Sequence, residues 1–166
     1  MKLDDFVQAM QSQPGFGSSF EGGAYYDRQT NTIAESTRGG DGCVDDLDDD
    51  ADLEDWQKEE LEQNRLIEDD EAANLETPSK RRFVLLPDSF EIHEWRMMED
   101  FSISLDNDDH AAQLSEAIHG SGAFGRFKSA VHRLGLADQW YAYRDARYRE
   151  IALEFCKENN IPLEET

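Results

Sequence analysis

This sequence contains little cysteine, little proline and little positive charge. Its 166 residues include two cysteines, four prolines and 16 Lys and Arg residues. Cys43 and Cys156 lack the paired spacing of a disulfide framework or a metal motif, which is typical of a protein in a reducing compartment. No apolar run approaches the roughly 18 residues that cross a bilayer, and the N-terminus lacks the apolar core of a signal peptide. We therefore expect a cytoplasmic protein that does not bind a membrane.

The shortage of basic residues leaves a net charge of −22 at pH 7, and this charge is unevenly distributed. Residues 1–80 carry −16 and residues 81–166 carry −6. A strongly acidic protein repels nucleic-acid phosphates overall. Any binding of nucleic acid would therefore depend on a local basic patch, and the acidic surface is better suited to basic partners.

The hydrophobic patterns predict both strands and helices in one domain, residues 1–166. In chain order they predict a helix over 3–11, hairpin strands at 24–26 and 32–34, a third strand at 82–86, and helices over 89–105, 111–118, 123–134 and 137–159. Asp88 and Glu91 have the spacing of a capping box, which marks the start of the first of these later helices. The predicted fold class is α+β, with a small antiparallel sheet of about three strands packed by a C-terminal set of about four helices.

The region between the hairpin and the third strand is acidic. Residues 41–55 predict a flexible acidic segment with little to bury, and we expect this segment to be dispensable for folding. A weak acidic helix is predicted from Trp56 to Ile67, followed by a linker over 68–80.

A calcium loop is the alternative interpretation of the acidic segment. Asp46, Asp48 and Asp50 match its alternate ligand positions. However, Ala51 stands where the loop needs glycine, and Gln57 stands where it needs glutamate. The sequence therefore favours the solvated segment and predicts no metal site there.

The only basic part of the chain is a basic-aromatic island at 120–149. Its glycines allow a ligand to approach the backbone closely, and the N-terminus of the helix that follows favours negative charge. The residues predicted to bind an anion or nucleic acid are Gly120, Gly122, Arg126, Lys128, Arg133 and Arg144. In the alternative interpretation, the cations border the core without a ligand and the aromatic residues, such as Trp140, belong to the core.

No catalytic constellation is recognisable. Glu116 and His119 have the Glu-x-x-His spacing of di-metal sites, but such sites need two of these motifs and the sequence contains one. No nucleophile elbow occurs. Cys156 lies within a predicted helix, where packing is the simpler role. The sequence therefore predicts no catalytic residues, no metal and no cofactor.

Two charges fall on predicted apolar helix faces. Glu94 lies among the apolar positions of the 89–105 helix, and Arg144 lies within the stripe of Trp140 and Tyr148 on the last helix. Because an isolated buried charge is costly, we expect Glu94 and Arg144 to form a structural ion pair between the two helices, with the guanidinium stacked on one of these rings. The alternatives are that each charge reaches solvent separately, or that Arg144 faces the glycines and holds an anion.

Several short motifs resemble a known family. They are Leu86-Pro87-Asp88-Ser89-Phe90-Glu91, Met98-Glu99-Asp100-Phe101, Gly122-Ala123-Phe124-Gly125-Arg126-Phe127-Lys128 and Trp140-Tyr141. These motifs resemble the bacterial group known as uncharacterised protein family 0158, mainly over residues 83–161. The resemblance implies an α+β cytoplasmic domain and carries no established activity. The runs at 12–23 and 41–55 look like variable additions to the family pattern.

Three hypotheses for function follow. The leading one is a non-enzymatic binding or regulatory module that uses the island at 120–149 to bind an acidic protein surface, a phosphate-bearing ligand or nucleic acid. The alternative is an acidic interaction protein that binds a basic partner through residues 41–76. The third is an enzyme of a class that these motifs do not reveal.

Overall fold

The computed structural model describes residues 1–13, 23–36, 54–73, 77 and 80–164. Its elements are α1 (Leu3–Ser12), β1 (Gly23–Asp27), β2 (Thr32–Ser36), α2 (Asp55–Ala73), β3 (Phe83–Leu85), α3 (Ser89–Ile92), α4 (Glu94–Ile103), α5 (Asp108–Ala117), α6 (Ala123–Arg133) and α7 (Ala137–Glu158). The α+β class is confirmed, with a three-stranded antiparallel sheet and helices after it. None of the described helices combines the length and the apolar character that a bilayer crossing needs.

The sheet has the order β2-β1-β3 and is covered on both faces. On one face, Tyr25 and Phe83 are buried with Ile67 of α2. On the other face, the ring of Tyr26 lies 5.5 Å from the ring of Phe6 on α1. Because strand side chains alternate between faces, the hairpin buries successive tyrosines against two different helices.

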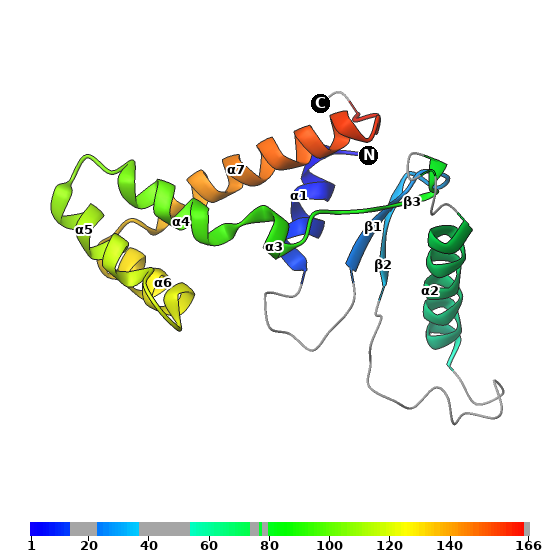
Figure 1. The fold of residues 1–166 in the computed structure, drawn as a ribbon, viewed down its shortest axis with the longest axis horizontal. Coiled ribbons are helices and arrows are strands. Elements are labelled where there is room, and N and C mark those ends of the chain that lie inside the picture. The colour runs from blue at the N-terminus through cyan, green and yellow to red at the C-terminus, as the bar shows by residue number, and fades with distance from the viewer. Residues whose placement is uncertain (14–22, 37–53, 74–76, 78–79, 165–166) are drawn as a thin grey trace.

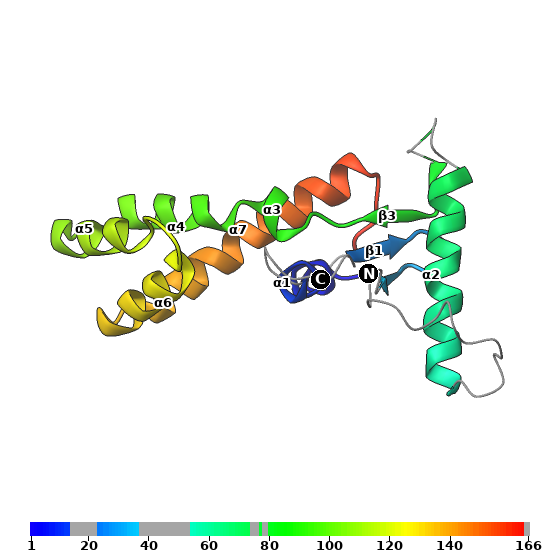
Figure 2. The ribbon, with the colours of Figure 1, turned by 60° about the horizontal axis from the view of Figure 1, so that its bottom comes forward.

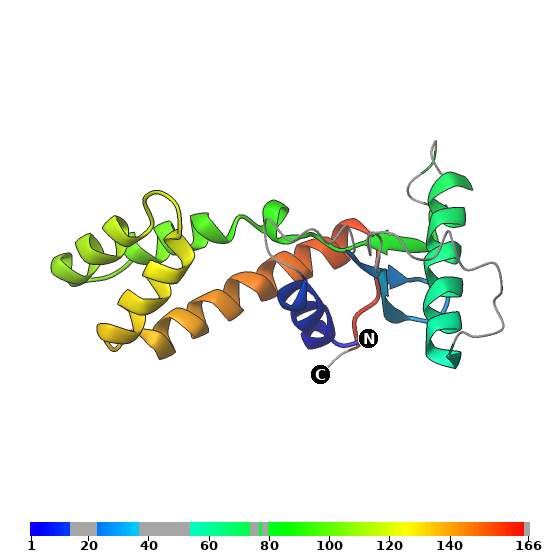
Figure 3. The same cartoon turned by 90° about the horizontal axis from the view of Figure 1, so that it is seen from below.

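The remaining helices form the opposite end of an elongated molecule (Figure 1). Figure 2 shows α5 and α6 at one end, and α2 with the sheet at the other. Seen from below in Figure 3, α7 runs from beside α6 past α1 toward the sheet. The ring of Trp140 on α7 lies 5.3 Å from that of Phe101 and 4.9 Å from that of Phe127, both edge-on. α7 therefore connects the core of the helical end to the sheet.

Side-chain caps set several helix boundaries where the sequence predicts them. The backbone N–H of Glu91 donates to the carboxylate of Asp88 over 2.8 Å, and the N–H of Asp88 donates back to Glu91, so the predicted capping box is confirmed. The side chain of Asn107 accepts hydrogen bonds from two N–H groups at the start of α5. Gly135 ends α6 with φ +70°, a conformation that glycine adopts without a Cβ clash.

The predicted continuous helix over 89–105 is wrong. His93 has φ +53° and separates the short α3 from α4. A left-handed residue of this kind interrupts the hydrogen-bond ladder and changes the helix direction. Consequently α4 begins at Glu94, and this places Glu94 in the first turn of a new helix.

The predicted linker over 68–80 is also partly helical, because α2 continues to Ala73. Of the residues of α2, all of them described, only Ile67 is buried. Sequence periodicity is a weak signal for a helix that buries so little. On α6, the side chain of Phe124 is 53% exposed, although its position along the helix is in phase with those of the buried Phe127 and Val131.

Candidate functional site

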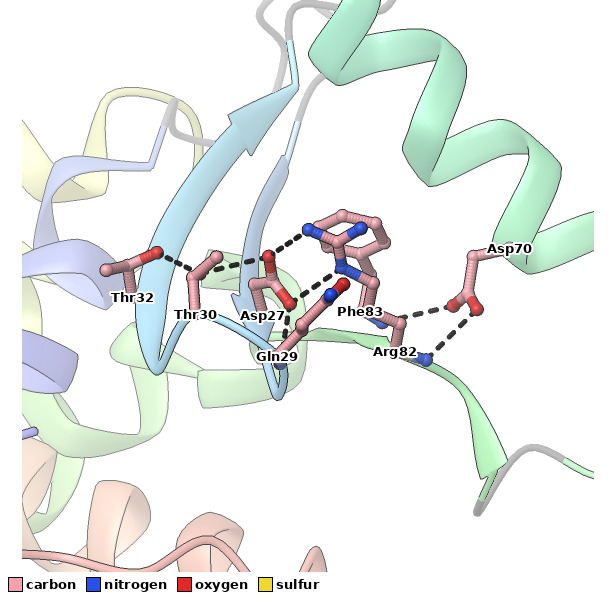
Figure 4. A network of polar contacts seen from close by, with 7 residues as sticks. All are labelled: Asp27, Gln29, Thr30, Thr32, Asp70, Arg82 and Phe83. Atoms are coloured by element: carbon pink, nitrogen blue, oxygen red, sulfur yellow. Dashed lines mark hydrogen bonds and ion pairs between the residues drawn. The ribbon is translucent and has the colours of Figure 1, made fainter.

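An ion pair between a buried aspartate and a partly exposed arginine lies where the hairpin loop begins (Figure 4). Arg82 approaches Asp27 with two nitrogens, with Nε 2.9 Å from Oδ1 and Nη2 2.7 Å from Oδ2. The same carboxylate accepts hydrogen bonds from the backbone N–H of Gln29 and the hydroxyl of Thr30. Asp27 is only 3% exposed, so its carboxylate depends on these donors rather than on water.

The environment of Asp27 keeps its carboxylate ionised. Burial alone would raise the pKa of Asp27, but the hydrogen bonds from Arg82, Gln29 and Thr30 outweigh burial and lower that pKa to about 2. The guanidinium of Arg82 also lies over the ring of Phe83, 4.7 Å from its centroid. The pair is therefore neutral as a unit and rigid, which suits a structural clamp better than acid–base chemistry.

Asp70 joins α2 to this clamp. Its carboxylate accepts hydrogen bonds of 3.0 Å from the backbone N–H groups of Arg82 and Phe83, as Figure 4 shows. The end of α2 is thereby tied to the start of β3. The hairpin, the third strand and α2 are held by one polar network at this end of the sheet.

The network closes one end of a groove of about 500 Å³ between β2 and α2, which we call the β2–α2 groove. Its lining comprises Asp27, Thr30, Thr32, Ile33, Ala34, Glu35, Trp56, Glu59, Glu60, Gln63 and Arg82. Asp27 is paired with Arg82, and the carboxylates that α2 contributes to the groove are those of Glu59 and Glu60. Glu35 lines the groove from β2, but its side chain alternates with that of Ala34 and faces α1. Trp56 is 63% exposed, and its indole ring therefore offers an aromatic surface at the groove.

Arg126 has a different role in the basic-aromatic island from the one that we expected. Its guanidinium donates to the backbone carbonyls of Ala117, His119, Gly120 and Ser121. These carbonyls lie at the C-terminus of α5 and just after it, where a helix carries partial negative charge. Gly120 and Gly122 have φ of +78° and +75°, which lets the chain fold around the guanidinium. Arg126 thus caps α5 from the neighbouring helix.

The structure does not gather the six expected anion-binding residues into one site. Gly120 and Gly122 lie beside Arg126. Arg133 donates to the side chain of Gln113, and it lines a groove of about 550 Å³ between α5 and α6 together with Arg126. Lys128 is exposed and does not line that groove. Arg144 instead contacts α4.

Glu94 and Arg144 are brought together as an ion pair. Arg144 Nη2 lies 2.8 Å from Glu94 Oε1, and Nε lies 3.0 Å from the same oxygen. The hydroxyl of Tyr148 donates to that oxygen over 2.6 Å, and the guanidinium lies 5.1 Å from the centroid of the Tyr148 ring. Burial, together with the hydrogen bond to Glu94, raises the pKa of Tyr148, so its proton stays in place. The contact links α4 to α7 and leaves no base or nucleophile free.

The other chemical groups singled out in the sequence do not assemble into a reactive site among the described residues. Cys156 is buried, and burial raises the pKa of its thiol to about 11, so the reactive thiolate is disfavoured. In the described ranges, no three His, Cys, Asp or Glu side chains form a metal-binding group. The possible calcium ligands Asp46, Asp48 and Asp50 lie outside those ranges, and the side chain of Gln57 accepts a hydrogen bond from the N–H of Glu54 at the start of α2.

Sequence patterns alone missed the Asp27–Arg82–Asp70 network. The one available signal was the order Asp27-x-x-Thr30 at a strand end, which is typical of an aspartate that accepts hydrogen bonds from its own turn. Nothing in the sequence links this turn to Arg82, 55 positions later, or to Asp70.

A comparison with protein families identifies a match over most of the chain. The model of the uncharacterised protein family UPF0158 matches residues 28–164, most of the chain and more than the motifs at 83–161 indicated. Neither the curated proteins nor the solved structures contain a significant match. The match begins at the hairpin loop and includes β2, α2 and the helical end. The chain belongs to the uncharacterised protein family UPF0158.

Proposed function

We propose that this protein is a non-enzymatic protein-binding module that takes a Lys- and Arg-rich segment of a partner protein in the β2–α2 groove. The observation that carries the proposal is the combination found there: an open groove of about 500 Å³ with two glutamates of α2, Glu59 and Glu60, and an exposed tryptophan. Glutamates accept hydrogen bonds from lysine and arginine, and a tryptophan face attracts the same cations. The groove therefore has the chemistry for a basic segment.

The weak packing of α2 supports the same proposal. Trp56, Leu61 and Leu66 are all exposed on this helix, and its mean hydropathy is low. Exposed large apolar side chains beside carboxylates are typical of binding surfaces with an aromatic anchor. Because the clamp at Asp70 fixes one end of α2, the helix is positioned without needing a large core.

The basic-aromatic island receives less support as a binding site. Arg126 is occupied by backbone carbonyls and Arg144 by Glu94, so two of its cations already have partners. The overall charge of −22 also favours a basic partner over a phosphate-bearing one. Long-range attraction of this kind speeds association and weakens with salt.

The proposal is tested with a fluorescent nonapeptide of alternating lysine and threonine at physiological ionic strength. Glu59→Gln with Glu60→Gln should weaken binding about tenfold, because each lost charge contact contributes up to about 1 kcal/mol. Trp56→Ala should weaken it further. The control is Glu154→Gln with Glu158→Gln, which removes the same charge from exposed positions on α7.

The control variant should bind within about twofold of the unmodified protein, and both variants should melt normally. Equal loss in the two variants would mean that the peptide senses only the overall charge, and the groove would then not be the binding site.

A further inference from the structure

The backbone of β2 has one side without a neighbouring strand in the described part of the sheet. The N–H of Leu86 donates to the carbonyl of Ala24, and the N–H of Arg28 donates to the carbonyl of Arg82. The backbone N–H and C=O groups of Ala24 and Arg28 are therefore directed toward β3. Backbone direction alternates along a strand. The backbone N–H and C=O groups of Tyr25 are therefore directed toward β2, where Tyr25 is opposite Ala34.

It follows that Ile33 and Glu35 direct their backbone N–H and C=O groups away from β1. Their positions opposite Tyr26 and Ala24 place them in the pairs that do not exchange hydrogen bonds within the hairpin. Because the order is β2-β1-β3, these groups lie along the outer edge of the described sheet. A row of such donors and acceptors is a template for another strand.

This edge lies between two grooves. The β2–α2 groove is on one face, and a groove of about 380 Å³ between β2 and α1 is on the other. The second groove is lined by Met1, Asp5, Gln8, Ala9, Ser12, Ile33 and Glu35. Ile33 and Glu35 are thus the residues shared by both grooves.

We propose that the partner's basic segment binds as an added β-strand along the outer edge of β2, so that its alternate side chains enter the two grooves. The inference rests on the proposed function and specifies its geometry. One set of side chains enters the β2–α2 groove beside Glu59 and Trp56. The other set lies over Asp5 and Glu35. Both sets meet carboxylates, so a segment with cations at alternate or successive positions fits the edge.

The charges also decide against other strands. A second copy of β2 would bring Glu35 and the acidic walls of both grooves close to their own duplicates, and like charges across a pair are unfavourable. Residues 41–53 of this chain contain seven aspartates and no basic residue, so the same repulsion opposes their pairing here. A basic segment from another protein meets no such repulsion.

Gln63 adds a polar group that a bound segment could use. Its amide nitrogen is buried and has no acceptor among the described residues, and Gln63 lines the β2–α2 groove. Rotation of this side chain toward the groove would bring the nitrogen to the bound segment. A backbone carbonyl of the added strand, on the side away from β2, could then accept its hydrogen bond.

Backbone N-methylation of the Lys-Thr nonapeptide tests the strand directly. One peptide is methylated at the threonine amides and another at the lysine amides, so the side chains and charges remain the same. Methylation should abolish binding only at the amides that face β2. With the lysines in the β2–α2 groove, these are the threonine amides if the segment is antiparallel to β2 and the lysine amides if it is parallel. If both peptides bind like the parent, or both fail, strand addition is wrong.

A matched pair of variants tests the same edge from the protein side. Glu35→Pro removes the outward N–H and should leave the hairpin ladder intact, whereas Glu35→Gln removes the same charge and keeps the N–H. Glu35→Pro should bind the parent peptide about fivefold to tenfold more weakly than Glu35→Gln, with similar melting. Equal affinity would contradict the added strand.

Binding that depends on Glu59 and Glu60, but not on peptide N-methylation or on Glu35→Pro, would support the proposed function and exclude strand addition as its geometry. A dimer that the peptide does not dissociate would mean that a second copy of the protein occupies the edge, and this outcome would also contradict the added strand.

Discussion

Asp27 shows how hydrogen bonds can make a buried carboxylate favourable for the stability of the folded protein. Removing a charge from water is costly, but this carboxylate receives four hydrogen bonds, two of them from a guanidinium. The lowered pKa of Asp27 measures the balance, because the native state holds the ionised form more strongly than water does. Losing Arg82 would leave the charge of Asp27 buried with fewer contacts.

We predict that Asp27→Asn lowers the free energy of unfolding by about 2 kcal/mol at pH 7, since the pKa falls from 3.8 to about 2 on folding. A lowered folded-state pKa stabilises the protein above the unfolded pKa, and this stabilisation is lost as the pH falls toward 2. The difference between variant and unmodified protein should therefore shrink to about 1 kcal/mol at pH 3. Urea denaturation at the two pH values measures both quantities.

Glu158→Gln is the control for this experiment, because Glu158 is exposed at the end of α7. It should change the unfolding free energy by less than about 0.5 kcal/mol at both pH values. A difference between Asp27→Asn and the unmodified protein that does not depend on pH would refute the ionisation argument.

At the scale of elements, the contact between α4 and α7 depends on a polar group as well as on aromatic packing. Glu94 accepts hydrogen bonds from both Arg144 and Tyr148 in a site where its side chain is 23% exposed. The break at His93 places Glu94 at the start of α4, where helix N–H groups also favour a negative charge. The three side chains fix how far along α7 the helix α4 packs.

A double-mutant cycle tests this contact. Glu94→Ala and Arg144→Ala should each destabilise the protein by about 2 kcal/mol, and the double variant should cost about 1 kcal/mol less than their sum, because it leaves no partner unpaired. Glu94→Gln should cost less than Glu94→Ala, since an amide oxygen still accepts from Tyr148. Strict additivity in chemical denaturation would show that the pair contributes no coupling.

At the scale of the whole molecule, the negative charge is concentrated in the N-terminal half of the sequence, where residues 1–80 carry −16 of the total of −22. Residues 41–53 contribute seven aspartates, and the binding proposal does not require them. Glu54 belongs to the start of α2, because its carbonyl accepts from Gln57 and Lys58. The segment that we expect to be dispensable for folding therefore ends at residue 53 rather than 55.

Replacing residues 41–53 by a Gly-Ser segment of equal length should change the free energy of unfolding by less than about 2 kcal/mol, the scale of one large buried side chain. The replacement relieves some self-repulsion and should weaken the attraction of the peptide at low salt more than at high salt. Thermal melting and peptide titrations at two salt concentrations measure these effects. A larger loss of stability would mean that the segment belongs to the folded core.

Local chemistry explains why much of the fold was predictable. The hairpin, the third strand and most helix boundaries follow from alternation, helical periodicity and caps such as Asp88 and Asn107, all of which act over a few residues. The break at His93 escaped prediction because no glycine or proline marks it. The C-terminal turns of α2 were not predicted because the contacts that hold them, such as those of Asp70 with the start of β3 and of Glu71 with Tyr25, are tertiary contacts.

The sequence by itself determined the α+β class, the family and the uneven acidic charge, since each depends on composition or on patterns along the chain. It also placed Glu94 and Arg144 on apolar helix faces, but their pairing was one of three alternatives that only the tertiary structure could separate. Only the tertiary structure decided what the basic residues do. Arg126 closes the end of α5 and Arg82 neutralises Asp27 because the fold brings them there. It also placed Trp56 and the glutamates of α2 across from the outer edge of β2. Spacing along the chain cannot specify which side of a sheet a distant helix covers, and the candidate site depends on that choice.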